Sequence, residues 1–170
     1  MEEIISLDSV DYIRDGKYIL KNVSWHVKRG EHWVILGPNG SGKTTTLNMV
    51  NGYIFPSNGH VKVLEFEFGH SSIVELRKRI GWVSSALSQF IPTNDYPLHI
   101  VLSGKFASLG LWEKVDDADV ARANEILDLL KMRHIADRKY GMLSQGEKQK
   151  VLIGRALMNE PDIIILRLSW

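Results

Sequence analysis

Cysteine is absent from the 170 residues of the sequence, and neither sign of charge dominates. Without cysteine there are no disulfide bridges, thiolate metal ligands or cysteine nucleophiles, so metal chemistry would need oxygen or imidazole ligands. The 21 Lys and Arg residues nearly balance the 20 Asp and Glu residues, which leaves a formal net charge of +1. This balance creates no global field that attracts nucleic acid, so a polyanion has to be bound locally and no nucleic-acid partner is expected.

Long hydrophobic runs are also missing, since no apolar segment approaches the ~18 residues of a membrane span. The N-terminus reads Met-Glu-Glu-Ile and has neither the basic nor the apolar region of a secretion signal. We therefore expect a cytoplasmic chain with no direct membrane insertion. The 44% hydrophobic and 24% charged residues are typical of a folded globular domain.

The first part of the sequence is rich in β-forming residues. Val23, Trp25 and Val27 alternate with other residues, which indicates one buried strand face. Asp15 and Gly16 form a turn signal. We predict an antiparallel meander with strands at residues 5–12, 18–20 and 23–27.

A glycine-rich loop follows an uninterrupted apolar run at residues 33–36, which predicts a strand buried on both faces of a parallel sheet. Backbone N–H groups of such a loop, and the N-terminus of the next helix, can cradle phosphate oxygens. In a phosphate-binding loop of this kind, Lys43 would bridge the β- and γ-phosphates of a nucleotide, and the Thr44 hydroxyl would ligate Mg²⁺. The phosphate-binding pattern G-x-x-x-x-G-K-[ST] is matched by Gly37, Pro38, Asn39, Gly40, Ser41, Gly42, Lys43 and Thr44.

Beyond the loop, residues 43–51 predict a helix with Leu47 and Val50 inward and Gly52 as its terminator. Strands are expected near residues 60–66 and 80–84. The region from about 86 to 140 is mainly helical in pattern. Its clearest helix begins near Asp116 and carries apolar residues at helical spacing, namely Val120, Ala123, Leu127 and Leu130.

Ser144 and Glu147 form an S-x-x-E capping box, which predicts the start of a helix that continues through Ala156 and stops before Pro161. Residues 163–166 are uniformly apolar and predict another buried strand.

The loop at residues 37–45, which ends at Thr45, is followed downstream by a second characteristic stretch. Together the two resemble motifs of the nucleotide-binding domain of ABC ATPases. That stretch resembles the family's LSGGQ-type signature and consists of Leu143, Ser144, Gln145, Gly146 and Glu147. The resemblance implies an α/β P-loop NTPase fold with an antiparallel β subdomain, a parallel core sheet and a helical subdomain. It also implies ATP and Mg²⁺ as cofactors.

The resemblance covers essentially the whole chain and implies a division into three parts. Residues 1–85 would form the β meander and P-loop core, and residues 86–140 the helical subdomain. Residues 141–170 would hold the signature helix and the start of the Walker B strand.

Partners follow from the same resemblance. ABC domains pair head to tail with a second ABC domain, identical or different, and in transporters a permease subunit holds them at the inner face of the membrane. Ser144 and the Gly146 amide, at a helix N-terminus, would capture γ-phosphate oxygens in trans. Tyr12 precedes the first turn, where such domains carry an aromatic residue that stacks on adenine, and Tyr18 is a less well-placed alternative.

Two features depart from the family pattern. Ser85 stands where the family usually has a Gln that touches Mg²⁺ and the attacking water. The Walker B Asp and Glu positions hold Arg167 and Leu168, which removes a metal anchor and the general base. We therefore assign no catalytic residue and expect a chain that lacks the C-terminal part of the domain and hydrolyses ATP weakly or not at all.

Three functions stay open at this point. The first is the ATP-binding domain of an ABC-type ATPase, whose family couples ATP hydrolysis to transport or to a soluble process. The second is an ATP-binding-only fragment with a regulatory or pseudo-enzyme role. The third is another P-loop kinase or NTPase, which the loop alone allows but the signature and the meander disfavour.

Overall fold

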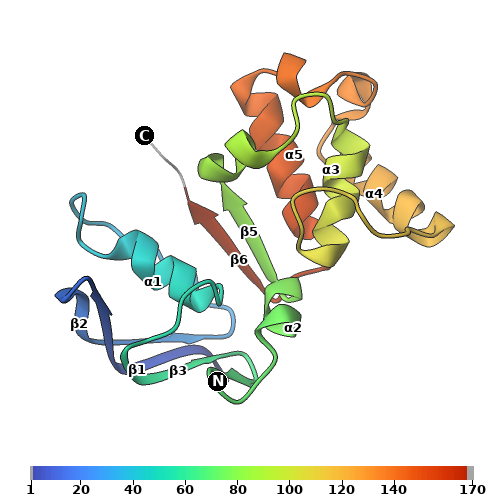
Figure 1. Ribbon diagram of the computed structural model, residues 1–170. Helices are drawn as coiled ribbons and strands as arrows, with labels where there is room; N and C mark the ends of the chain where they lie inside the picture. Colours follow the sequence, from blue (N-terminus) through green and yellow to red (C-terminus); the bar gives the residue numbers. More distant parts are fainter. Residues whose placement is uncertain (1, 168–170) are drawn as a thin grey trace. The chain divides into compact units, whose positions relative to one another are not determined.

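A computed structural model describes residues 2–167 of the chain, and its ribbon is drawn in Figure 1. The chain divides into two compact units, Met1–Arg77 and Lys78–Trp170. Leu168, one of the predicted Walker B positions, lies outside the described residues. Over the described range, every helix is too short or too polar to cross a bilayer.

The first unit contains a four-stranded sheet in the order β2-β1-β3-β4, in which all neighbours are antiparallel. The glycine-rich loop and helix α1 lie between β2 and β3 in the chain (Figure 1). The elements are β1 (Glu3–Arg14), β2 (Lys17–Lys28), α1 (Lys43–Val50), β3 (Asn58–Val63), β4 (Phe66–Glu67) and α2 (Ile73–Lys78), which leads into the second unit.

The predicted antiparallel pairing of the N-terminal strands is confirmed. Asp15 and Gly16 both have positive φ angles, of 50° and 72°, as the tight turns that suit twisted hairpins require. Val27 is buried with Val23 and Trp25 half-buried on the same face. The predicted break between residues 20 and 23 is wrong, because β2 runs through it with a bulge at Asn22.

A bulge in β1 sets which side chains of the hairpin share a face. Leu7 pairs with Trp25 and Val10 pairs with Val23, so β1 has one extra residue in between and Ser9 takes a positive φ of 49°. The extra residue keeps Leu7 and Val10 on the same buried face despite their odd spacing.

The predicted strand at residues 33–36 is not present. Residues 31–38 have no regular secondary structure, and Val34 and Leu36 are 79% and 86% exposed. An apolar strand of this kind is stable only between two hydrogen-bonded neighbours. No strand within residues 2–167 pairs with this segment.

Two other boundaries differ from the expectation. The strand predicted at residues 60–66 is split into β3 and β4, because Leu64 takes a positive φ of 54° and turns the chain. Helix α1 ends at Val50, which is buried as predicted, while Leu47 is only half-buried. Gly52 follows with a φ of 71° and donates its N–H to the Met49 carbonyl, as a terminator does.

The second unit packs three helices together and carries a two-stranded parallel sheet (Figure 1). Its regular elements are β5 (Ile80–Ser84), α3 (Pro97–Ser103), α4 (Asp117–Leu129), α5 (Gln145–Leu157) and β6 (Ile163–Arg167). Short 3₁₀ turns lie between them at Ser85–Phe90, Gly104–Phe106, Arg133–Ile135 and Tyr140–Met142. The mainly helical region predicted from 86 to 140 is therefore confirmed.

Both predicted helix starts of this unit are confirmed. Asp116 caps α4, with Asp119 completing a reciprocal capping box. Of the predicted inward residues of α4, Ala123 and Leu127 are fully buried, and Val120 and Leu130 pack against the same core.

The strands predicted at residues 80–84 and 163–166 are present as β5 and β6 and pair in parallel, but β6 is not buried on both faces as predicted. Val83 and Leu166 are paired neighbours on one face, yet Val83 is buried in the helical core while Leu166 is 58% exposed. The reason is that α5 packs over β5, whereas no helix of the described residues packs to a similar extent over β6. Ile163 and Ile165, on the opposite face, are buried.

Candidate nucleotide-binding site

The glycine-rich loop leads directly into helix α1 in the first unit. Gly40 and Gly42 have φ angles of 81° and 86°, a conformation that suits glycine. A Cβ on Gly37 would lie 2.9 Å from the Ser41 hydroxyl, so this position has little room for a side chain. The loop thus exposes backbone where a side chain would otherwise stand, as a phosphate cradle requires.

The first turn of α1 is suited to an anion. Gly42, at the N-cap, offers no side-chain hydrogen bond to the helix, and the first turn holds no acidic residue. At the N-terminus of α5, by contrast, the Ser144 side chain accepts a hydrogen bond from the Glu147 amide. Because the first N–H groups of a helix lack intrahelical acceptors, the start of α1 can receive phosphate oxygens, with Thr44 and Thr45 half-buried in that first turn.

Lys43 folds back over the loop that precedes it. Its ammonium group donates hydrogen bonds to the carbonyl oxygens of Gly37 at 2.6 Å and Pro38 at 2.7 Å, and to the Ser41 hydroxyl at 3.2 Å. All three ammonium donors are therefore used within the loop. The contacts place the positive charge of Lys43 over the cradle, where an anionic ligand would be attracted.

Tyr12 lies on the sheet face that meets the end of the loop. It pairs directly with Leu20 across the hairpin, and directly opposed residues of an antiparallel pair share a face. The Leu20 side chain in turn lies against Gly42, within 2.5 Å of where a Cβ would be. Tyr12 is half-buried, so part of its ring is available to a ligand. Tyr18 is more exposed, at 53%, with the Lys21 ammonium 5.4 Å from its ring centre.

The signature-like residues form the N-terminus of α5 in the second unit. Leu143 is buried, while Ser144, Gln145 and Gly146 are exposed. The Ser144 amide donates to the Glu147 carboxylate at 2.7 Å, and the Glu147 amide donates to the Ser144 hydroxyl at 3.3 Å. No atom lies within 4 Å of the Cβ position of Gly146, so the tip of this turn is open to an incoming group.

Ser85 and Arg167 both lie at the carboxyl ends of the parallel strands of the second unit. Ser85 follows β5 and begins a 3₁₀ turn with an exposed side chain, and Arg167 is the last residue of β6. Ser84 pairs with Arg167 across the sheet, so the two departures from the family pattern are neighbours. The predicted Walker B position at the end of β6 thus holds a cationic side chain.

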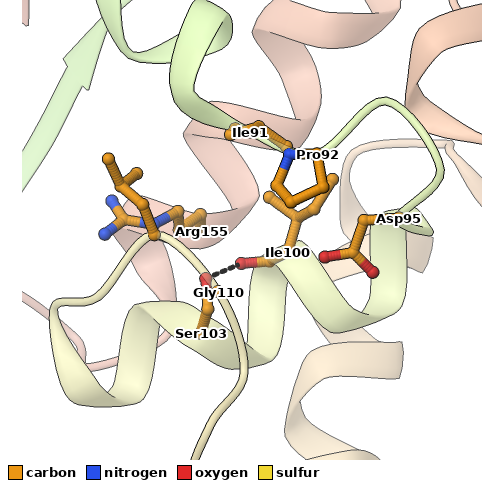
Figure 2. A pocket seen from close by; sticks show the side chains of 8 residues that line it. Ile91, Pro92, Asp95, Ile100, Ser103, Gly110 and Arg155 are labelled. Carbon is orange, nitrogen blue, oxygen red and sulfur yellow. Dashed lines mark hydrogen bonds between the residues drawn. The ribbon is translucent and has the colours of Figure 1, made fainter.

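A separate shallow hollow opens in the helical part of the second unit (Figure 2). The Arg155 guanidinium at its edge donates two hydrogen bonds to the Ser108 carbonyl, at 3.1 and 2.6 Å. Ser103 donates to the Ile100 carbonyl at 2.7 Å, shown as a dashed line. The hollow leaves no enclosed space for even a water-sized group, and these two polar groups are satisfied internally, so the hollow is a packing feature.

Two contributors to these sites have no motif of their own. Leu20 supports Gly42 from the neighbouring strand, and Arg138 contacts the turn that carries the signature-like residues. Neither follows from local sequence, because the first depends on a bulged strand register and the second on the path of the chain between two helices.

The fold and the loop define a P-loop nucleotide-binding protein of the ABC type. The sequence model described as "ABC transporter" matches residues 20–166. The chain belongs to the ABC transporter ATP-binding family.

Known proteins give the same result. The chain is 46% identical over 164 residues to an uncharacterized ABC transporter ATP-binding protein of Bacillus subtilis, YlmA, with 96% of this chain and 62% of that protein covered. The first curated relatives are thus matched over about 62–63% of their own length.

Solved structures agree at the level of fold. A nucleotide-free ATP-binding cassette of an ABC transporter superimposes with a TM-score of 0.81 at 29% identity, covering 97% of this chain and 68% of that one. A dimeric cassette in a post-hydrolysis state bound to ADP and Pi superimposes with a TM-score of 0.77 at 29% identity, covering 94% of this chain and 72% of that one.

Proposed function

We propose that this chain binds ATP at residues 37–45 as an ABC ATP-binding domain. The observation that carries the proposal is the glycine-rich loop that runs into the uncapped start of α1, with the Lys43 charge held over it. The Lys43 ammonium would exchange its bonds to the loop carbonyls for bonds to phosphate oxygens, and Tyr12 would stack on the adenine ring. Mg²⁺, held by the Thr44 hydroxyl and the phosphates, would neutralise phosphate charge.

A second copy of an ABC domain is the partner that we propose for the signature-like turn. The exposed Ser144 and the open Gly146 position would meet a nucleotide held by the other domain. Support comes from the similar cassette whose structure is dimeric with ADP and Pi, and from a similar protein described as part of an ABC transporter complex. A permease subunit and a cytoplasmic location at the membrane face belong to the same proposal.

Hydrolysis by this chain is proposed to be weak or absent. Arg167 and Leu168 occupy the positions at which the family carries its Walker B carboxylates, so the chain offers neither a metal-binding carboxylate nor a general base there. This favours the reading in which the chain binds ATP without turnover and acts in regulation. A different P-loop kinase is disfavoured by the family to which the chain belongs.

Calorimetric titration of the full chain with ATP and Mg²⁺ tests the binding site. Lys43→Ala should weaken ATP binding by roughly tenfold to a hundredfold, the worth of hydrogen bonds from a charged donor. Lys62→Ala changes an equally charged residue on β3 of the same unit and should leave affinity unchanged. Equal ATP affinity in the wild type and Lys43→Ala would overturn the assignment of the loop.

A phosphate-release assay tests the second part of the proposal, that this chain hydrolyses ATP weakly or not at all. In the presence of Mg²⁺ the wild type should release phosphate no faster than Lys43→Ala. Sustained release by the wild type that Lys43→Ala abolishes would contradict the proposed lack of turnover.

A further inference from the structure

Arg138 joins two parts of the turn that carries the signature-like residues. One guanidinium nitrogen, Nη2, donates to the Met142 carbonyl oxygen at 3.0 Å. The other, Nη1, lies 3.4 Å from the Glu147 carboxylate. A planar guanidinium can bridge two acceptors in a fixed geometry, which a flexible ammonium cannot do as well. Arg138 therefore connects the segment before Leu143 to the first turn of α5.

Glu147 transmits that contact to the exposed tip. Its carboxylate accepts the Ser144 amide at 2.7 Å, and Arg138 approaches the other carboxylate oxygen of the same side chain. The hydrogen bonds from the Ser144 amide and hydroxyl hold the pKa of the Glu147 carboxyl below its ordinary value, and the positive charge of Arg138 acts in the same direction. The carboxylate is thus kept ionised between two donors.

The opposite end of this turn is fixed by the core. Tyr140 is only 2% exposed, its hydroxyl lies 2.8 Å from the Ser88 hydroxyl, and its amide donates to the Asp95 carbonyl at 2.8 Å. Between this anchor and α5 the chain is exposed at Gly141 and Met142. Arg138 binds the Met142 carbonyl within that exposed stretch, which explains how a residue outside the signature can orient it.

We propose that Arg138 is a positioning residue for the signature-like turn, which holds Ser144 and Gly146 in the orientation that meets ATP on a second domain. The inference rests on the proposed head-to-tail pairing and adds a residue outside the motif to it. Arg138 touches neither nucleotide nor reacting atoms in this scheme and acts through Met142 and Glu147.

Arg133 provides a matched control in the same unit. It forms a closer ion pair, with Nε 2.8 Å and Nη2 2.6 Å from the two carboxylate oxygens of Asp128, and it also bonds to Asn124. These partners lie on α4 and not on the signature-like turn. A variant of Arg133 therefore removes an arginine with stronger pairing and leaves the turn intact.

The experiment compares the wild type, Arg138→Gln and Arg133→Gln in three measurements on the full chain. The first is ATP affinity by calorimetry, which reports the loop in the first unit. The second is hydrogen exchange of the Ser144 amide by NMR, and the third is ATP-dependent dimer formation by analytical ultracentrifugation. Arg138→Gln should leave the ATP affinity of the monomer unchanged when it is titrated at a protein concentration too low for dimer formation. It should accelerate Ser144 exchange and weaken the ATP-dependent dimer by about tenfold, the worth of one hydrogen bond to a charged group. Arg133→Gln should change neither exchange nor dimer.

The outcomes separate the two proposals. Unchanged Ser144 exchange and dimer formation in Arg138→Gln would overturn the positioning role, as would equal effects from Arg133→Gln. A wild type that binds ATP without forming a dimer would overturn the pairing and the positioning role with it. If the wild type does not bind ATP, calorimetry detects this directly, and the proposed function itself is overturned.

Discussion

Leu20 and Gly42 are in contact across the first unit, so that the Leu20 Cδ2 atom lies 2.5 Å from where a Cβ on Gly42 would be. The Ile19 carbonyl oxygen lies 3.2 Å from the same point. Since Gly42 also has a φ of 86°, a side chain here meets both a steric clash and an unfavourable backbone conformation. The contact ties the start of α1 to strand β2.

The first prediction follows from that contact. Gly42→Ala should lower the free energy of unfolding by roughly 2–4 kcal/mol, from left-handed strain and overpacking together, and should abolish ATP binding as the loop shifts. Gly16→Ala is the control, because Gly16 has a φ of 72° but no atom within 4 Å of its Cβ position. Urea unfolding should show a loss of about 1 kcal/mol for Gly16→Ala. Equal losses for the two variants would mean that the Leu20 contact has no energetic role.

The second prediction concerns adenine recognition. Tyr12→Ala should weaken ATP binding by roughly tenfold, since stacking of a base on an aromatic ring is worth about 1–3 kcal/mol. Tyr12→Phe should keep the affinity, because the ring and not the hydroxyl makes the stack. Tyr18→Ala serves as the comparison, and a larger effect there than at Tyr12 would transfer the adenine site to Tyr18. Fluorescence titration with a labelled ATP analogue measures all three.

The third prediction is a pH dependence that comes from one ion pair. The Lys105 ammonium, hydrogen-bonded at 2.6 and 2.7 Å, holds the pKa of Asp119 below its ordinary 3.8, and Asp119 raises the pKa of Lys105 above its ordinary 10.5. Because folding lowers the pKa of the Asp119 carboxyl, its charge stabilises the fold above pH 3.8, and this stabilisation is lost as the pH falls through the folded-state pKa. Because folding raises the pKa of the Lys105 ammonium, its charge stabilises the fold below pH 10.5, and this stabilisation is lost as the pH rises through the folded-state pKa.

The contribution of this ion pair to the free energy of unfolding should therefore be constant between pH 3.8 and pH 10.5 and should fall at more acid and more alkaline pH. Asp119→Asn should lower the urea midpoint near neutral pH and flatten the fall at acid pH. Asp117→Asn alters the neighbouring acidic residue of the same first turn and should keep the acid limb of the wild type. An unchanged acid limb in Asp119→Asn would show that other carboxyl groups dominate acid unfolding.

The fourth prediction addresses Arg167, at the end of β6. Arg167→Asp replaces a cation by a carboxylate at the position that we propose for the Walker B Asp. On that proposal, Mg²⁺ should tighten ATP binding by roughly tenfold more in this variant than in the wild type, the worth of one contact to a charged group. Titrations with and without Mg²⁺ measure the difference. Arg122→Asp makes the same charge change on α4. If it gives an equal Mg²⁺-dependent gain in ATP affinity, the effect comes from net charge and not from the position of Arg167.

Local patterns were enough to predict much of this fold. The capping pairs Asp116 with Asp119 and Ser144 with Glu147 are found as reciprocal hydrogen bonds, and the Asp15–Gly16 turn closes the first hairpin. Each of these features depends on residues within four positions of one another. Such short-range chemistry is visible in the sequence itself.

Features that depend on distant partners were not predictable in the same way. The apolar run at residues 33–36 reads as a strand, but a strand of this type exists only with paired neighbours, and it has none among the described residues. The exposure of Leu166 depends on which strand α5 covers. Of the candidate sites, the glycine-rich loop follows from its motif, whereas Leu20 and Arg138 depend on tertiary contacts that no local pattern encodes.

The bulge at Ser9 has a consequence for how the hairpin can vary in length. Strand β1 carries one residue more than its partner between Leu7 and Val10, and that extra residue decides which face of the sheet receives Tyr12. If β1 paired over the same three-residue spacing without the bulge, plain alternation would turn Val10, and Tyr12 two residues further on, to the side opposite Leu7. Deleting Ser9 would instead leave Leu7 and Val10 two residues apart and on one face, so the hairpin should tolerate this deletion without moving Tyr12 away from the glycine-rich loop, about thirty residues downstream.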